Sequence, residues 1–272
     1  MKINLKNKVA LITGASQGMG FEIAKCLAMH GAKVFLVSRN KKNLIKAVNI
    51  IKKNRGNAEY CIGDISKKKT HQNVFKACQK KFGNIDILVN NSGGPPMGTI
   101  LEHDESAWDM AIQTNMLSVV RFSKLVLPIM KKKCWGRIIT ITSTVTKEPS
   151  PEMVLSATTR GGLSAFSKAI ALEYAKFNIT ANNICPGGVL TDRLHNLFKE
   201  KSIREKSDYN KLLENAQKSI AANRFAEPEE IANIVLFLTS EYGSYINGVS
   251  LSVDGSLTKG YQCKIHLKKI FL

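Results

Sequence analysis

The chain has 272 residues, of which 44% are hydrophobic, enough to bury the core of one domain. No segment is apolar for long enough to cross a bilayer, and the amino terminus lacks the apolar core of a signal peptide. The formal net charge is +19, but the basic residues are spread along the chain without an aromatic-interleaved stripe. We therefore expect a cytoplasmic protein with no nucleic-acid partner and no membrane span.

The first predicted element is a buried strand, KVALIT (8–13), which is apolar and rich in β-branched residues. Helical spacing follows over residues 17–30, and the turn between them reads TGASQGMG (13–20). Glycines in such a turn let the backbone approach a pyrophosphate, and the helix amino terminus offers free N–H groups. This position favours a dinucleotide site over a plain strand–helix turn.

The second predicted strand, KVFLVS (33–38), ends at Ser38 and Arg39, and a lysine-rich helix follows to about residue 55. A carboxylate at this strand end would bind a ribose 2′-hydroxyl and favour NAD(H). Arg39 instead offers a forked cation for a 2′-phosphate, so NADP(H) is the expected cofactor. A solvated basic turn is the structural alternative.

The same alternation continues to the end of the chain. The further strands are predicted at AEYCIG (58–63), IDILVN (85–90), GRIITITS (136–143), NITANNIC (178–185) and VSLSVDG (249–255), with helices over 66–82, 105–131 and 153–174. Buried strands separated by helices predict a single doubly wound Rossmann-type α/β domain over residues 1–256, with a parallel seven-stranded sheet and helices on both faces. The polar segment 192–222 is a candidate substrate lid, and residues 257–272 form a basic tail.

The six cysteines lie neither in a CxxC pair nor near histidines at metal spacing. We therefore expect reduced thiols and no metal site.

An ordered set of motifs resembles the short-chain dehydrogenase/reductase family. The set comprises TGASQGMG (13–20), Asp64 with Ile65, NNSG (90–93), Asn115, Ser143 and PGGVLT (186–191). Later pieces, RFAEPEEIANIVLFLTS (224–240) and YINGVSLSVDG (245–255), resemble its 3-oxoacyl-acyl-carrier-protein reductase branch.

The resemblance implies a function and a role for each matching residue. It implies NADP(H)-dependent reduction of a small or acyl-carrier-linked carbonyl, with Asn115 in a proton relay and Ser143 on the substrate carbonyl. The cofactor contacts it implies are Gly14, Ser16, Gln17, Gly18, Met19, Gly20, Ser38, Arg39, Asp64, Ile65, Asn91, Gly93, Pro186, Gly187, Val189 and Thr191.

The chain departs from the family at the residues that carry the proton chemistry. The family's tyrosine falls thirteen residues after its serine and its lysine four further on, which leads from Ser143 to Ser156 and Arg160. Arg160 keeps a charge for the nicotinamide ribose but, with an ordinary pKa above about 12, exchanges no proton. NSGGPP (91–96) with SATTR (156–160) resembles a family subgroup that shares this replacement.

The general base is not named by the sequence. Glu148, Glu152 and His103 are candidates only because they lie in loops near the expected mouth of the site. A nucleotide-binding protein without redox turnover, or a lyase or isomerase on the same fold, remains an alternative. The resemblance also implies a homodimer or homotetramer that pairs through helices 105–131 and 155–177.

Overall fold

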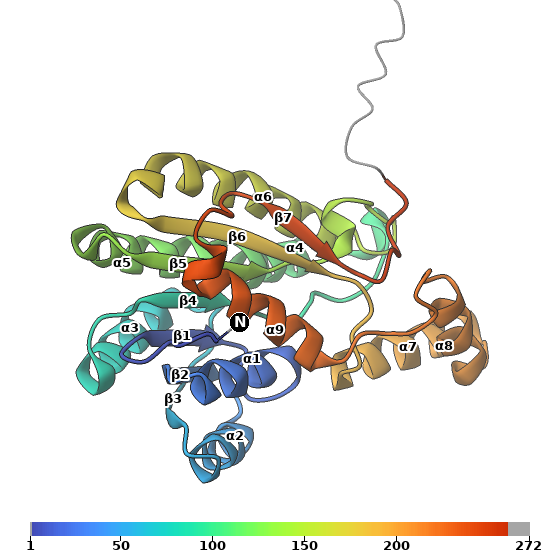
Figure 1. Cartoon of the computed structure of the whole chain (residues 1–272). Helices are drawn as coiled ribbons and strands as arrows, with labels where there is room; N and C mark the ends of the chain where they lie inside the picture. The colour runs from blue at the N-terminus through green and yellow to red at the C-terminus, as the bar shows by residue number, and fades with distance from the viewer. Residues whose placement is uncertain (1, 261–272) are drawn as a thin grey trace, which may run out of the picture.

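A single parallel sheet forms the centre of the protein. The computed structural model describes residues 2–260, and its strands follow the order β3-β2-β1-β4-β5-β6-β7 (Figure 1). Neighbouring strands pair in parallel throughout. The strands are β1 (Val9–Thr13), β2 (Lys33–Ser38), β3 (Asn57–Ile62), β4 (Ile87–Asn90), β5 (Gly136–Ile141), β6 (Ile179–Pro186) and β7 (Ser250–Val253). The predicted fold class is confirmed.

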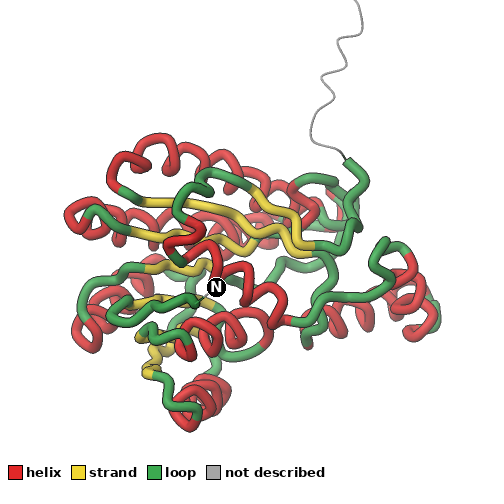
Figure 2. Tube along the Cα trace, in the orientation of Figure 1, coloured by secondary structure: helices red, strands yellow, loops and turns green. Residues whose placement is uncertain are grey.

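Helices cover both faces of the sheet, as Figure 2 shows in red on either side of the yellow strands. They are α1 (Gly18–Met29), α2 (Lys41–Lys53), α3 (Lys68–Phe82), α4 (Glu105–Ala111), α5 (Ser118–Lys133), α6 (Val154–Tyr174), α7 (Asp192–Glu205), α8 (Tyr209–Lys218) and α9 (Pro228–Thr239). The proposed lid segment, 192–222, contains α7 and α8, which lie beyond the arrowhead of β6 in Figure 1. Of the predicted tail, residues 261–272 lie outside the described part of the chain.

The two faces of the sheet bury separate hydrophobic clusters because successive strand residues point in opposite directions. Ala10 and Ile12 of β1 pack with α1, α2 and α9, whereas Val9 and Leu11 pack with α3, α5 and α6. This burial on both faces explains why the strands appear as continuous apolar runs in the sequence.

The parallel strands place the predicted site residues together at the carboxyl ends of the strands. From β1 the chain builds outward through β2 and β3, then returns to the other side of β1 with β4 and continues to β7. The carboxyl ends of β1 and β4 therefore flank the point where the strand order reverses, which is the usual ligand crevice of such sheets. Within residues 2–260, no helix is both long and apolar enough to span a membrane.

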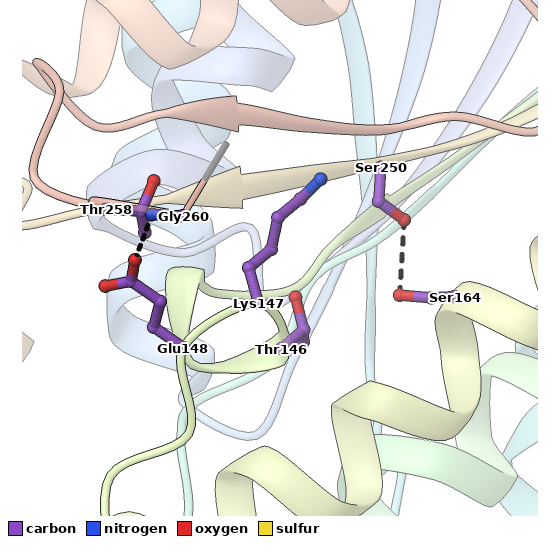
Figure 3. A pocket seen from close by; sticks show the side chains of 7 residues that line it. All are labelled: Thr146, Lys147, Glu148, Ser164, Ser250, Thr258 and Gly260. Atoms are coloured by element: carbon purple, nitrogen blue, oxygen red, sulfur yellow. Dashed lines mark hydrogen bonds between the residues drawn. The ribbon is translucent and has the colours of Figure 1, made fainter. Parts of the chain in front are cut away.

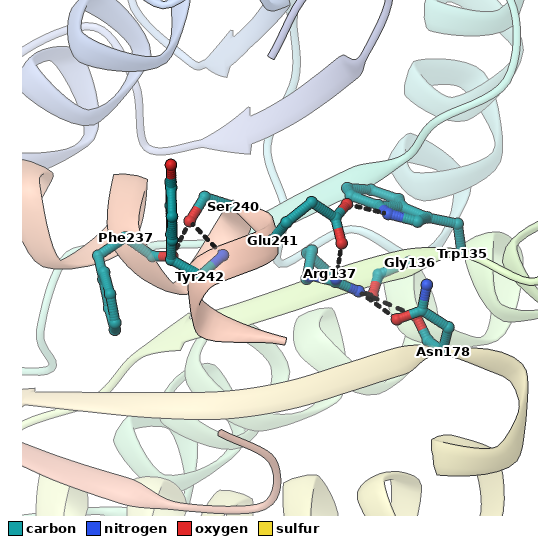
Figure 4. Close-up of polar contacts among 8 residues, drawn as sticks. All are labelled: Trp135, Gly136, Arg137, Asn178, Phe237, Ser240, Glu241 and Tyr242. Atoms are coloured by element: carbon teal, nitrogen blue, oxygen red, sulfur yellow. Dashed lines mark hydrogen bonds and ion pairs between the residues drawn. The ribbon is translucent and has the colours of Figure 1, made fainter. Parts of the chain in front are cut away.

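A buried arginine, Arg137, holds the sheet together at the amino ends of the strands, at the start of β5 (Figure 4). The Arg137 side chain is fully buried, and its Nη1 donates to the carbonyl oxygens of Gly136 and Asn178, each at 2.9 Å. The guanidinium carbon lies 4.5 Å from the Trp135 ring centroid, and Nη2 lies 3.7 Å from Glu241 Oε2. These contacts join the beginnings of β5 and β6, whose far ends carry Ser143 and Pro186.

We expect Arg137→Met to lower the free energy of unfolding by about 1–3 kcal/mol. Methionine keeps the apolar stem but leaves the two carbonyl groups without their buried charged donor. Denaturant titration followed by circular dichroism would measure the change. Glu241→Gln is the control: its side chain is mostly exposed, so we expect a change below about 1 kcal/mol. Equal effects of the two substitutions would contradict this account.

Candidate functional site

The glycine turn after β1 is tightly packed against the end of β4. Gly14 has φ +58°, and a Cβ on it would lie 2.8 Å from the Asn91 carbonyl oxygen. A Cβ on Gly20 would lie 2.3 Å from the Gly14 carbonyl oxygen. Neither position accepts a side chain without movement of the backbone, so the glycines are required by the turn itself.

Hydrogen bonds hold the turn in this position. Thr13 Oγ1 donates to the Asn91 carbonyl oxygen at 2.7 Å and accepts from Asn91 N at 2.9 Å. Asn91 Nδ2 donates to the Gly14 carbonyl oxygen at 3.1 Å. The Asn91 side chain thus supports the turn, and the predicted contact of this residue with the cofactor stays a prediction.

The amino terminus of α1 is open. Its N-cap residue, Gln17, is extended and its side chain makes no capping hydrogen bond. The first N–H groups of the helix are thus without a side-chain acceptor and carry the positive end of the helix dipole. Gln17 points its amide elsewhere: Nε2 donates to Asp192 Oδ2 at 3.1 Å, and Oε1 accepts from Asn43 Nδ2 at 2.9 Å.

The end of β2 carries the predicted specificity residues beside the same turn. Ser38 Oγ lies 2.9 Å from Ser16 Oγ, which joins the strand end to the glycine turn. Arg39 is exposed and makes no salt bridge with any described carboxylate.

Asp64, after β3, is held in a local turn in which its Oδ1 accepts from Ser66 N at 3.0 Å and from Ser66 Oγ at 2.8 Å. Partial burial opposes its ionisation, but the bonds from Ser66 and the charges of Arg39 and Lys67 outweigh burial, so the pKa of Asp64 lies below its ordinary value. The acidic group near Arg39 is therefore Asp64, which follows β3. The end of β2 itself carries no carboxylate.

Asn115 interrupts the long helix predicted over 105–131. The π-helical segment η2 (Ile112–Leu117) separates α4 from α5, and π segments often occur at functional sites. Asn115 is buried, and its Nδ2 donates to Ser92 Oγ at 2.8 Å and to the Gly93 carbonyl oxygen at 2.9 Å. The amide nitrogen thus supports the loop after β4, and Oδ1 remains as an acceptor for the proposed water relay.

The loop after β6 lies over the glycine turn. A Cβ on Gly18 would be 3.3 Å from Thr191 Cγ2, so the two loops are in close contact. Thr191 also begins α7: its Oγ1 accepts from Leu194 N at 3.3 Å as the N-cap. Backbone bonds from Leu190 N to the Ala226 carbonyl oxygen (2.9 Å) and from Ala226 N to the Gly188 carbonyl oxygen (2.9 Å) fix the rest of this loop.

Ser156 and Arg160 form a direct pair on α6. Both are buried, and Arg160 Nη1 donates to Ser156 Oγ at 2.9 Å. They are one helical turn apart, which brings their side chains to the same face. Ser143, at the end of β5, caps a short 3₁₀ turn by accepting from Val145 N at 3.4 Å. A hydroxyl carries one donor and two acceptor sites, so both serines keep an O–H to donate.

The surroundings of Arg160 are unusual for a cation. Burial, and secondly the charge of Arg193, lower the pKa of Arg160 to about 10. The pKa of Arg160 is thus below the ordinary arginine value expected from the sequence, yet its guanidinium stays protonated at neutral pH. Arg193 itself lies near the start of α7, and its Nη2 donates to the Pro95 carbonyl oxygen at 2.7 Å.

Arg193 was not predicted as a site residue. The one available signal was a cation two residues after Thr191, in the segment proposed as a lid.

Glu148 and Glu152, two of the three loop residues considered as general bases, are engaged elsewhere. Glu148 Oε1 accepts from the backbone N–H groups of Lys259 and Gly260, each at 2.5 Å. Glu152 pairs with Lys201 and Arg204 on α7. The His103 ring packs against Gly98, where an added Cβ would be 2.7 Å from Cε1.

A hollow of about 400 Å³ lies between α6, β7 and the segment before residue 260 (Figure 3). Ser164 and Ser250 line it together, and the Ser250 hydroxyl donates to Ser164 Oγ at 3.2 Å. The full lining is Thr146, Lys147, Glu148, Ser164, Ser250, Thr258 and Gly260. Only Glu148 among these residues had been considered for the chemistry, as a possible general base, and none belongs to the predicted cofactor set, so we place the candidate site at the glycine turn and the Ser156–Arg160 pair instead.

Comparison with known proteins shows the family. The chain belongs to the short chain dehydrogenase family, whose sequence profile matches residues 8–202. It is 35% identical to the 3-oxoacyl-acyl-carrier-protein reductase FabG of Escherichia coli over 255 residues, which cover 94% of this chain and 99% of that protein. It is 32% identical to D-beta-hydroxybutyrate dehydrogenase of Cupriavidus necator over 257 residues, covering 92% and 98%.

Among solved structures, the L-sorbose reductase of Gluconobacter frateurii, in complex with NADPH and L-sorbose, superposes with a TM-score of 0.90 at 32% identity. The match covers 96% of this chain and all of that one.

Proposed function

We propose that this protein is an NADP(H)-dependent oxidoreductase that reduces a ketone or a 3-oxoacyl-type carbonyl. The observation that carries the proposal is the buried Arg160–Ser156 hydrogen bond, which gives the chain a polarised hydroxyl where the family has its tyrosine. The relatives support the reaction class, since they are named as reductases and dehydrogenases of oxo and hydroxy compounds.

The residues of the glycine turn fit a dinucleotide. The cradle around Gly14 and Gly20 has no room for side chains, and the N–H groups at the start of α1 have no side-chain cap. A pyrophosphate supplies the negative charge that such a helix end favours. Ser38 and Arg39 would bind the 2′-phosphate, and residues 186–191 would hold the nicotinamide. When bound, NADPH supplies the hydride.

The protein's own residues then act on the carbonyl oxygen. Donation from the Arg160 guanidinium withdraws electron density from Ser156 Oγ, which makes the serine O–H a stronger donor. Ser143 provides the second O–H, and together they stabilise the negative charge that develops on the oxygen. We infer that the proton finally comes from solvent, through a water held near Asn115, because serine and arginine are poor proton donors at neutral pH.

We further infer that the segment NSGGPP (91–96) and the Ser156–Arg160 replacement belong together, as they do in the family subgroup that the chain resembles. A Cβ on Gly94 would lie 3.7 Å from Arg160 Nη2, which is an ordinary van der Waals contact, and 3.3 Å from Arg193 Nη2, which is tighter. The second glycine of NSGGPP thus lies beside the Arg160 guanidinium and chiefly leaves space for Arg193.

The cofactor preference is tested at Arg39. We expect Arg39→Asp to reverse a preference for NADPH over NADH, because charge-assisted hydrogen bonds of about 1.5–3 kcal/mol each are replaced by repulsion. Titration of both cofactors, followed by intrinsic fluorescence, measures the two affinities. Lys46→Asp makes the same charge change on the exposed side of α2 and should leave the preference as it is. Parent protein that binds NADH as tightly as NADPH would refute the assignment.

The chemistry is tested at Ser156 and Arg160 by following NADPH absorbance against a panel of ketones and 3-oxoacyl thioesters. Ser156→Ala should keep NADPH binding and lower turnover about 10²-fold or more, since it removes the polarising donor. Arg160→Ala should weaken NADPH binding as well. Ser156→Tyr with Arg160→Lys restores the family pair and should raise turnover if the ring fits.

Ser164→Ala, two turns along the same helix, is the matched control and should behave as the parent. If the parent binds NADPH but reduces no carbonyl compound, a nucleotide-binding role without redox turnover, or a non-redox reaction, replaces the proposed function. If Ser156→Ala is as active as the parent, Ser156 has no chemical role.

We also propose a homodimer or homotetramer that pairs through α4–α5 and α6. Space around the Cβ position of Gly161 is open within the described chain, and Leu172 on the same helix is 75% exposed. A smooth helix face with an exposed leucine suits close helix–helix contact. Light scattering at micromolar concentration should give twice or four times the monomer mass, and Leu172→Glu should reduce it. A monomeric parent would refute the proposal.

A further inference from the structure

Two guanidinium groups converge on one point beside Gly94. The place where a Cβ of residue 94 would stand is 3.3 Å from Arg193 Nη2 and 3.7 Å from Arg160 Nη2. The two arginines come from different elements, α6 and α7, and meet at the loop that follows β4. Because residue 94 is glycine, no side chain separates them.

The pair has no acidic partner within reach. Across residues 2–260, no carboxylate lies within 4 Å of Arg160 or Arg193, although other basic residues of the protein form such pairs. Arg160 is only 8% exposed, and the charge of the exposed Glu200 acts on Arg193 from beyond salt-bridge distance. Burying cations side by side is costly unless an anion compensates them.

Most of the donors on these groups are also unused. Each guanidinium has five N–H donors. Within the described chain, Arg160 uses one on Ser156 Oγ and Arg193 uses one on the Pro95 carbonyl oxygen. These bonds fix the orientation of both planar groups and leave further donors for a ligand. Paired guanidinium groups suit carboxylate and phosphate, which accept forked hydrogen bonds.

We propose that Arg160 and Arg193 bind an anionic group, a carboxylate or a phosphate, on the carbonyl substrate itself. This rests on the proposed function, because it places the anion next to the Ser156 hydroxyl that polarises the carbonyl. The substrate is then an oxo acid or a phosphorylated ketone whose anionic group lies within a few bonds of the carbonyl carbon. Arg193 acts as a specificity residue, and Arg160 serves both the anion and Ser156.

The cofactor's own phosphates are the competing ligands. They are assigned to other elements: the pyrophosphate to the turn 14–20 and the 2′-phosphate to Ser38 and Arg39. The nicotinamide end of the cofactor carries no phosphate apart from its half of that pyrophosphate. An anion at the arginine pair therefore has to come with the substrate, and the Arg193 variant tests this directly.

Binding is measured first, by calorimetry on the protein–NADPH complex at fixed ionic strength, with malonate and inorganic phosphate as separate probes. We expect the parent to bind at least one of them and Arg193→Gln to bind it about tenfold or more weakly, since a charge-assisted forked contact is lost. Arg193→Lys should fall between. Lys199→Gln removes one positive charge from the exposed side of the same helix and should match the parent.

Turnover is measured second, with acetoacetate against methyl acetoacetate and dihydroxyacetone phosphate against dihydroxyacetone. We expect the parent to favour the anionic member of at least one pair, and Arg193→Gln to reduce that ratio of kcat/KM about tenfold or more. The pair of substrates whose ratio falls shows whether the arginines recognise a carboxylate or a phosphate.

The proposal is overturned if the parent binds neither malonate nor phosphate, or if Arg193→Gln leaves both the anion affinity and the substrate ratio unchanged. It is also overturned if Arg193→Gln weakens NADPH itself as much as it weakens the anion, because the pair would then serve the cofactor. Loss of the proposed function looks different: anion binding persists while no carbonyl compound, charged or neutral, is reduced.

Discussion

The contact between the glycine turn and the end of β4 is the constraint on which the functional site depends. Thr13 and Asn91 exchange hydrogen bonds there, and Asn91 also donates to Gly14. These bonds join neighbouring strands at the point where the strand order reverses, so they fix the start of α1 relative to the loop 91–96. Asn115 supports the same loop from the helical side. The turn 14–20 and the loop 91–96 are thereby held to each other rather than being two independent loops.

Beside these two loops, this chain has Ser156 and the cation Arg160 where its family has a tyrosine and a lysine. A guanidinium in place of an ammonium changes what the site can recognise, because arginine is a planar group with fixed donor directions and remains charged when buried. The hydrogen bond to Ser156 uses one of those directions, and the others face the loop at Gly94. In the function proposed above, the replacement of tyrosine and lysine exchanges a proton-donating centre for one that recognises and stabilises negative charge.

Much of the fold could be predicted because burial on both faces makes the strands continuous apolar runs and because turns such as 14–20 demand glycine. The π segment at Asn115, by contrast, has no clear period of its own in the sequence. Contacts between distant segments were beyond prediction. Nothing near Arg193 in the sequence indicates that its side chain reaches Pro95, 98 residues away. Likewise, the bond from Asn91 to Gly14 depends on a strand order that only the folded sheet provides.

The hydrogen bond between Gln17 and Asp192 couples two elements that lie far apart in the sequence. It connects the residue before α1 to the first residue of α7, and Asn43 of α2 holds the other side of the same amide. Because Asp192 belongs to α7, a displacement of that helix breaks the bond to Gln17 and frees the residue that precedes α1. Both side chains are exposed, so the bond is weak and α7 can release it at low cost.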